Sequence, residues 1–240
     1  MVRYGTLMAL LAALFRVGFV AADEPMTPEE LEQWFNSDDD AVARALAVNE
    51  GELVFLAAPP AKAVHHLRNR LTIGPASLDD GFVELYQCHD HLDAVHEAQV
   101  VYHYQRLRNL RIDSQSGIAK VWVEGDTVQM VDIGKDARLC VRAEVGILYA
   151  NADGSYTLRN GPFHRRFLDG YYPMHVTLEI RYAPTLLRFD AITPKEQPGF
   201  HIIHEPEGVT VEAWFEGILT TETRFTRALT CSDCLSPAKR

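Results

Sequence analysis

The sequence lacks any apolar run long enough to cross a membrane. The most apolar stretch, Leu7–Phe15, has nine residues, whereas a membrane-spanning helix needs about 20. Arg3 precedes this stretch and Val20-Ala21-Ala22 follows it, which is typical of a secretory signal peptide and its cleavage site. We therefore expect residues 1–22 to be a signal peptide, with an uncleaved membrane anchor as the alternative. The mature chain would then be soluble and without an integral membrane segment, periplasmic in a bacterium and secreted in other organisms.

The sequence also lacks an excess of positive charge. The whole chain has 23 Lys and Arg residues against 33 Asp and Glu residues, a formal net charge of −10. Removal of residues 1–22, which contain Arg3 and Arg16 and no acid, changes the sum to 21 − 33 = −12. Such a charge opposes nonspecific binding to nucleic acid or to an anionic membrane surface. The expected partner is therefore an envelope protein or a small ligand.

No complete catalytic motif is present. The sequence contains neither the G-x-S-x-G motif of a serine hydrolase nor a glycine-rich phosphate loop. The pair His96-Glu97 is followed by Val100 where a zinc protease motif would have its second histidine. These absences favour a noncatalytic protein and leave an enzymatic function open.

Cysteine is scarce, with four residues at positions 88, 140, 231 and 234. An even number of cysteines in an exported chain indicates disulfides, and four cysteines allow three pairings. We favour Cys88–Cys140, because both lie in strand-like segments, which leaves Cys231–Cys234 in the tail. The C-x-x-C spacing of the second pair also fits a thiol–disulfide centre, but a reactive pair normally stands at a helix N-terminus. A structural tail disulfide is the favoured interpretation.

The pattern of apolar residues divides the chain into four parts. After the signal peptide, the capping box Thr27-Pro28-Glu29-Glu30 and the acids after Ser37 predict a short helical pair within residues 23–51. From Glu52 onward the apolar residues alternate with polar ones, and Gly, Pro, Asn and Asp separate the runs. This pattern predicts an all-β body over residues 52–228, an antiparallel β-sandwich or barrel-like fold, and a tail over residues 229–240.

A faint repeat suggests that the body consists of two related halves, 52–150 and 151–228. Leu67 and Arg70 recur in type as Leu178 and Arg181, at an offset of 111 residues. Chance similarity between amphipathic strands is the alternative explanation.

The segment Cys88-His89-Asp90-His91, followed by His96-Glu97, is rich in side chains that bind metals. If residues 82–89 and 98–104 form a hairpin, His89, His91 and His96 fall in the loop at its end. With a nearby carboxylate they would suit a Zn²⁺ or Cu²⁺ site, to which His201 or His204 could be added from another loop. The alternative is a polar surface loop without metal.

A second candidate lies in the segment 161–173, which combines turn residues, two arginines and four aromatic residues. Arginine beside aromatic rings suits a carboxylate, phosphate or sugar ligand, so Arg165, Arg166, Tyr171 and Tyr172 are candidate ligand-binding residues. The alternative is a tight connection in which Asp169-Gly170 forms the turn and one arginine pairs with an acid.

Three functions are consistent with these features. The first is an exported, soluble, noncatalytic β-sandwich protein that acts through protein or ligand contacts in the cell envelope. The second is a zinc- or copper-binding carrier or hydrolase that uses the loop from His89 to His96. The third is a thiol–disulfide protein that uses Cys231 and Cys234.

Overall fold

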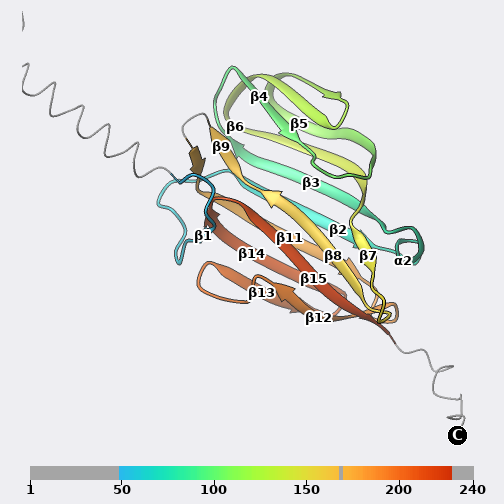
Figure 1. Ribbon diagram of the computed structural model, residues 1–240. Coiled ribbons are helices and arrows are strands. Elements are labelled where there is room, and N and C mark those ends of the chain that lie inside the picture. Colours follow the sequence, from blue (N-terminus) through green and yellow to red (C-terminus); the bar gives the residue numbers. More distant parts are fainter. Residues whose placement is uncertain (1–48, 168–169, 229–240) are drawn as a thin grey trace, which may run out of the picture. The chain divides into compact units, whose positions relative to one another are not determined.

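Most of the chain that the structure describes is β-strand (Figure 1). The computed structural model describes residues 49–167 and 170–228, which belong to one compact unit. The expected signal peptide, almost all of the expected helical segment, and the tail with Cys231 and Cys234 lie outside the described residues. Within the described ranges, no helix has the length and apolarity that a membrane crossing requires.

The strands form one large sheet, one small sheet and a hairpin. The large sheet has nine strands, which are β1 (Val54–Phe55), β2 (His66–Ile73), β3 (Phe82–Leu92), β4 (Glu97–Val101), β5 (Leu107–Glu124), β6 (Thr127–Gly146), β11 (Met174–Tyr182), β13 (Phe200–Glu205) and β14 (Gly208–Glu216). The small sheet has four strands, which are β7 (Leu148–Ala150), β8 (Tyr156–Phe163), β12 (Leu187–Thr193) and β15 (Leu219–Arg227). The hairpin consists of β9 (Arg165–Phe167) and β10 (Gly170–Tyr172), and one helical turn, α2 (Ser77–Asp80), joins β2 to β3.

The predicted mainly β fold is confirmed, with two corrections. The sheets do not close into a barrel, and the large sheet is mixed, because β2 and β11 run parallel. A parallel pair needs a long connection between its strands. Here all of β3 to β10 lies between them, so alternation within either strand could not reveal the pairing. Strands from both expected halves enter both sheets, since β7 belongs to the small sheet and β11 to the large one.

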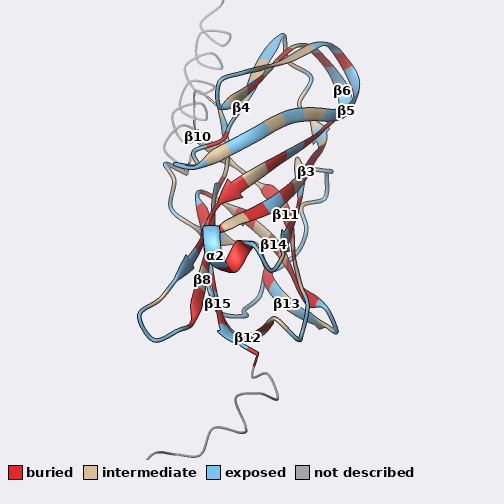
Figure 2. Cartoon of the chain, turned by 90° about the vertical axis from the view of Figure 1, so that its right-hand side faces the viewer, coloured by how far each residue is buried: buried red, intermediate tan, exposed pale blue. Residues whose placement is uncertain are grey.

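Alternation along the strands builds the core between the two sheets. In β2, for example, Leu67, Leu71 and Ile73 are buried and the charged residues between them point outward. Figure 2 shows this alternation of buried and exposed residues along the strands. One apolar cluster includes Leu71 and Phe215 of the large sheet together with Phe225 of the small sheet. Burial of each such side chain contributes about 1.5–3 kcal/mol.

The expected hairpin between residues 82–89 and 98–104 does not form. Strand β3 pairs with the C-terminal half of β6, from Phe82↔Gly146 to Leu92↔Ala137, and β4 pairs with its N-terminal half, from Glu97↔Val131 to Val101↔Thr127. The two strands therefore follow one another along the same partner. The link between them is a distorted continuation of the strand, in which the backbone oxygens of Val95 and His96 accept bonds from Ile133 and Asp132.

The long β5–β6 hairpin is bent by irregularities. The register between its strands shifts at three points along β5, all of them between Arg108 and Ile118. Such bulges bend a strand and increase its twist. The segment Glu124-Gly125-Asp126 forms the turn at the end of this hairpin, where Gly125 has a φ of 61°.

Cys88 and Cys140 stand opposite each other in the register of β3 and β6, and they form a disulfide with a Cα–Cα distance of 4.1 Å. The predicted pairing of these two cysteines is thereby confirmed. The bridge joins the neighbouring strands β3 and β6, near one end of the strand order of the large sheet, on the face turned away from the small sheet. That face also carries ion pairs, such as Arg70 with Glu179 and Arg142 with Asp113.

Candidate ligand-binding site

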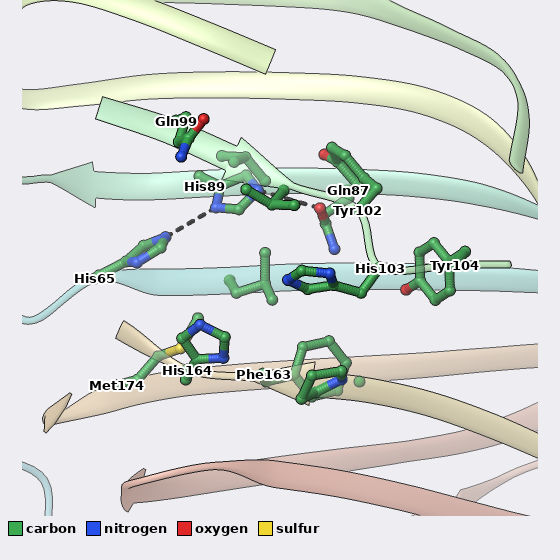
Figure 3. A pocket seen from close by; sticks show the side chains of 15 residues that line it. His65, Gln87, His89, Gln99, Tyr102, His103, Tyr104, Phe163, His164 and Met174 are labelled. Carbon is green, nitrogen blue, oxygen red and sulfur yellow. Dashed lines mark hydrogen bonds between the residues drawn. The ribbon is translucent and has the colours of Figure 1, made fainter. Parts of the chain in front are cut away.

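A pocket of about 190 Å³ lies where β4 of the large sheet and the end of β8 of the small sheet face each other (Figure 3). Its wall is formed by the start of β2, the middle of β3, β4 with the segment that follows it, and the segment from Gly161 to His164. None of its fifteen lining residues is Asp, Glu, Lys or Arg. Four of them are histidines, which Figure 3 shows on different sides of the pocket: His65, His89, His103 and His164.

Two of these histidines form a hydrogen-bonded chain with Gln87. Nε2 of His65 lies 3.0 Å from Nδ1 of His89, and Nε2 of His89 lies 3.1 Å from Oε1 of Gln87. Because an amide oxygen only accepts hydrogen bonds, Nε2 of His89 carries the proton and its Nδ1 accepts from His65. This assignment leaves Nδ1 of His65 as an acceptor, and within the described residues it has no hydrogen-bond partner.

Burial keeps both His65 and His89 uncharged. Removal from water lowers the pKa of His65 from 6.5 to about 4; nearby Arg165 lowers it further and Asp93 opposes the shift. Burial also lowers the pKa of His89 well below its ordinary value, and the neighbouring His65 adds to this effect. At neutral pH the hydrogen-bonded network of His65, His89 and Gln87 therefore presents uncharged hydrogen-bonding groups to the pocket.

The rest of the wall is also uncharged and contains polar atoms without partners among the described residues. Burial lowers the pKa of His164, and His103 and Arg166 lower it further. In the described part of the chain, Nδ1 of His164 and the hydroxyl of Tyr102 are buried and have no hydrogen-bond partner. Tyr104, by contrast, donates to Oδ1 of Asn160 over 2.9 Å. Unpaired buried polar atoms are uncommon and mark a place where a ligand or water is expected.

The first arginine predicted to bind a ligand is held next to this pocket by contacts within the protein. Nε and Nη2 of Arg165 lie 2.9 and 2.6 Å from the carboxylate oxygens of Asp93. The guanidinium also lies 5.2 Å from the ring centre of Phe167 and 5.6 Å from that of Tyr172. This placement matches the alternative interpretation, in which one arginine of the segment pairs with an acid.

Arg166 is exposed on the same hairpin and lies 5.5 Å from the ring centre of Tyr171. Arg166 is therefore more accessible to a ligand than Arg165. Neither arginine, and neither tyrosine of the hairpin, lines the pocket.

The three histidines predicted to bind metal have separate partners. His89 is 4 % exposed and points into the core from β3 rather than lying in a loop. His91 and His96 lie on the surface, with Nδ1 3.3 Å from Asp136 and 2.6 Å from Asp132 respectively. His89 differs from the expectation because β3 continues to Leu92 instead of ending in a turn.

Across the described ranges, no three or more His, Cys, Asp or Glu side chains are grouped so that they could hold a metal ion. His201 and His204 belong to β13, which pairs with β14, whereas β4 pairs with β6 at the other end of the strand order. The structure thus does not bring these two histidines to the segment from His89 to His96.

Sequence inspection missed most of the pocket. Gln87 and Tyr102 lie on the core side of their strands, and neither was among the candidate residues. The signal was a glutamine and a tyrosine at positions where alternation requires apolar residues. His65 and His164 could not be found in this way, because they lie next to strand ends, where alternation gives no information.

Comparison with known proteins supplies no relative from which a role could be transferred. No protein-family model matches the sequence, and no curated protein matches it either. The chemistry of the pocket is therefore the only basis for a functional assignment. The pocket offers hydrogen-bond acceptors and aromatic surface, and its lining contains no serine, threonine, cysteine, lysine or carboxylate that could act as a nucleophile.

Proposed function

We propose that this protein is an exported, noncatalytic β-sandwich protein that acts by binding a partner protein or a small ligand through the pocket between β4 and β8. The observation that carries the proposal is the wall of uncharged side chains, in which the hydroxyl of Tyr102 and Nδ1 of His164 are buried without a hydrogen-bond partner among the described residues and His65 offers a further acceptor. The disulfide between Cys88 and Cys140 supports export, because such bonds persist in oxidising compartments such as the periplasm or the cell exterior.

The chemistry of the wall defines the group that is bound. A charged group would lose its hydration without finding an opposite charge, which is costly, so the bound group is uncharged. The volume of about 190 Å³ suits a single ring, since a cavity of about 150 Å³ accepts benzene. The open acceptor on His65 favours a ring that carries a hydrogen-bond donor.

A binding function without catalysis is favoured by the state of the titratable groups. His65 and His89 are hydrogen-bonded to each other and to Gln87, and among the described residues neither forms a hydrogen bond with a nucleophile or with a carboxylate that would make it a stronger base. General acid–base catalysis works best with a group whose pKa lies near the working pH. Burial instead moves the pKa of His65 to about 4.

Titration of the purified protein with p-cresol, an uncharged ring with one hydroxyl donor, tests this proposal. We expect chemical-shift changes in amides of β4 and of the segment 161–164. The variant His65→Phe should bind p-cresol about three- to tenfold more weakly, the effect of one lost hydrogen bond. The matched control His96→Phe changes an exposed histidine outside the pocket and should leave the affinity unchanged. An absence of p-cresol binding, or equal effects of the two variants, would overturn the proposal.

A further inference from the structure

Strand β4 has one edge without a strand partner in the described part of the chain. It pairs with β6 alone. The backbone N–H of Tyr102 donates to Asp126 over 3.0 Å, and the oxygen of His96 accepts from Asp132 over 2.7 Å. Because bonding residues alternate along an antiparallel pair, the even-numbered residues of β4 bond to β6. The N–H and C=O groups of Glu97, Gln99 and Val101 therefore point toward the open edge.

This open edge has few of the features that usually protect an edge strand: it is short and carries one charged residue, Glu97. Natural edges are covered, or they carry proline, lysine or a bulge that prevents pairing with another chain. The sequence of β4, Glu97-Ala98-Gln99-Val100-Val101, has no proline and no lysine, and its pairing with β6 is regular throughout. The last residue of β4, Val101, is apolar and 37 % exposed. The edge is thus able to accept a further strand.

The pocket lies directly beside this edge. Gln99, Val100 and Val101 are part of its wall, as is Tyr102, whose hydroxyl is buried without a partner among the described residues. A strand that pairs with an edge directs every second side chain to the same face, and a pocket beside the edge then selects one of these side chains. The pocket has the volume of one ring, and therefore room for one such side chain.

We propose that the ligand is an extended segment of a partner protein, which adds a strand to the open edge of β4 and places one uncharged ring side chain in the pocket. Tyrosine fits best, because its hydroxyl can donate to Nδ1 of His65. The backbone bonds to Glu97, Gln99 and Val101 provide affinity independent of sequence, and the pocket provides selectivity. This inference rests on the proposed function of the pocket.

The probe for the test is the capped peptide Ac-Lys-Thr-Thr-Tyr-Thr-Thr-Lys-NH2, whose lysines also complement the acidic protein. Two further versions carry N-methyl groups, one on the second, fourth and sixth residues and the other on the third and fifth. Pairing with β4 uses the N–H groups of only one set. We therefore expect one methylated version to lose binding at least tenfold and the other to bind within about threefold of the parent. Replacement of the tyrosine by alanine should also weaken binding at least tenfold.

Two variants of the protein, in place of altered peptides, test the same pairing. Glu97 lies on β4 but does not line the pocket. Glu97→Pro removes an N–H that points away from β6, so the bonds between β4 and β6 remain, and proline is tolerated at such edge positions. We expect this variant to bind the peptide at least tenfold more weakly but to bind p-cresol as the unaltered protein does. Glu97→Ala, the matched control, loses the same carboxylate but retains the N–H, and it should bind both probes as the unaltered protein does. Should Glu97→Pro fail to fold, the methylated peptides still test the pairing on the unaltered protein.

The outcomes separate this inference from the proposed function. If p-cresol binds but the peptide does not, or binds equally in both methylated forms, strand addition is overturned and the pocket remains a small-molecule site. If neither probe binds, the proposed function itself fails.

Discussion

Nε2 of His65 lies 3.0 Å from Nδ1 of His89, so that each histidine is a hydrogen-bond partner of the other. The rings are also stacked, with centres 5.1 Å apart. A pair of buried histidines without charge is stable only while both stay deprotonated, because a proton on either ring would be buried next to its neighbour. This relationship links the stability of the fold to the binding chemistry of the pocket.

The first prediction concerns the dependence of stability on pH. Folding lowers the pKa of His65 from 6.5 to about 4, so the unfolded chain binds the proton more readily between these values. The resulting stability is complete above pH 6.5 and is lost as the pH falls toward 4. Between pH 7 and pH 5, His65 alone should account for a decrease of about 2 kcal/mol in the free energy of unfolding.

Urea denaturation at pH 7 and pH 5 measures this effect in the unaltered protein and in His65→Phe. The variant should lose less stability between the two pH values. Carboxylates such as Glu179, whose pKa is lowered by its hydrogen bond with Arg70, lose their contribution mainly below pH 5 and so interfere little. An identical pH dependence in both proteins would contradict the assignment of His65.

The second prediction concerns the pair formed by Arg165 and Asp93. Asp93→Ala removes the carboxylate and leaves a guanidinium that is only 17 % exposed without its partner. We expect a loss of about 1–3 kcal/mol in the free energy of unfolding. Arg166→Ala, on the exposed side of the same hairpin, should change it by less than about 0.5 kcal/mol. Equal effects in the two variants would show that the Arg165 pair has no special structural role.

The third prediction concerns the disulfide between Cys88 and Cys140, which closes a loop with a sequence separation of 52 residues. On the loop-entropy description, replacement of both cysteines by alanine should cost about 4 kcal/mol. Thermal unfolding in the absence of reductant measures the difference. A melting temperature unchanged from that of the unaltered protein would contradict a stabilising role for this bridge.

The fold shows which features a single sequence can reveal. Alternation predicted strands over residues 64–73 and 82–89, which the structure places in β2 and β3, and two cysteines in strand-like segments gave the correct pair. Alternation is a local property of the sequence, and four cysteines allow only three pairings. The partner of each strand is not encoded locally, because many strands have similar alternation. For this reason the parallel pairing of β2 with β11 was not predicted.

The link between β3 and β4 shows a second limit. Its polar residues, from Asp90 to His96, predicted a turn at the end of a hairpin. In the structure β6 is long enough, at 20 residues, to pair with both strands in succession. This placed His89 in the core beside His65 instead of in a loop beside His91. The candidate site changed because the length of a distant strand determined the path of the chain.

The most direct test of the uncharged pocket compares three ring compounds of similar size by titration of the unaltered protein. These are p-cresol, its methyl ether 4-methylanisole, which lacks the donor, and 4-methylbenzoate, which carries a charge. We expect p-cresol to bind about tenfold more tightly than 4-methylanisole, since the ether leaves the acceptor of His65 unpaired. The benzoate should show no measurable binding at pH 7. Binding of the benzoate as tight as that of p-cresol, or equal affinities for p-cresol and its ether, would contradict the account.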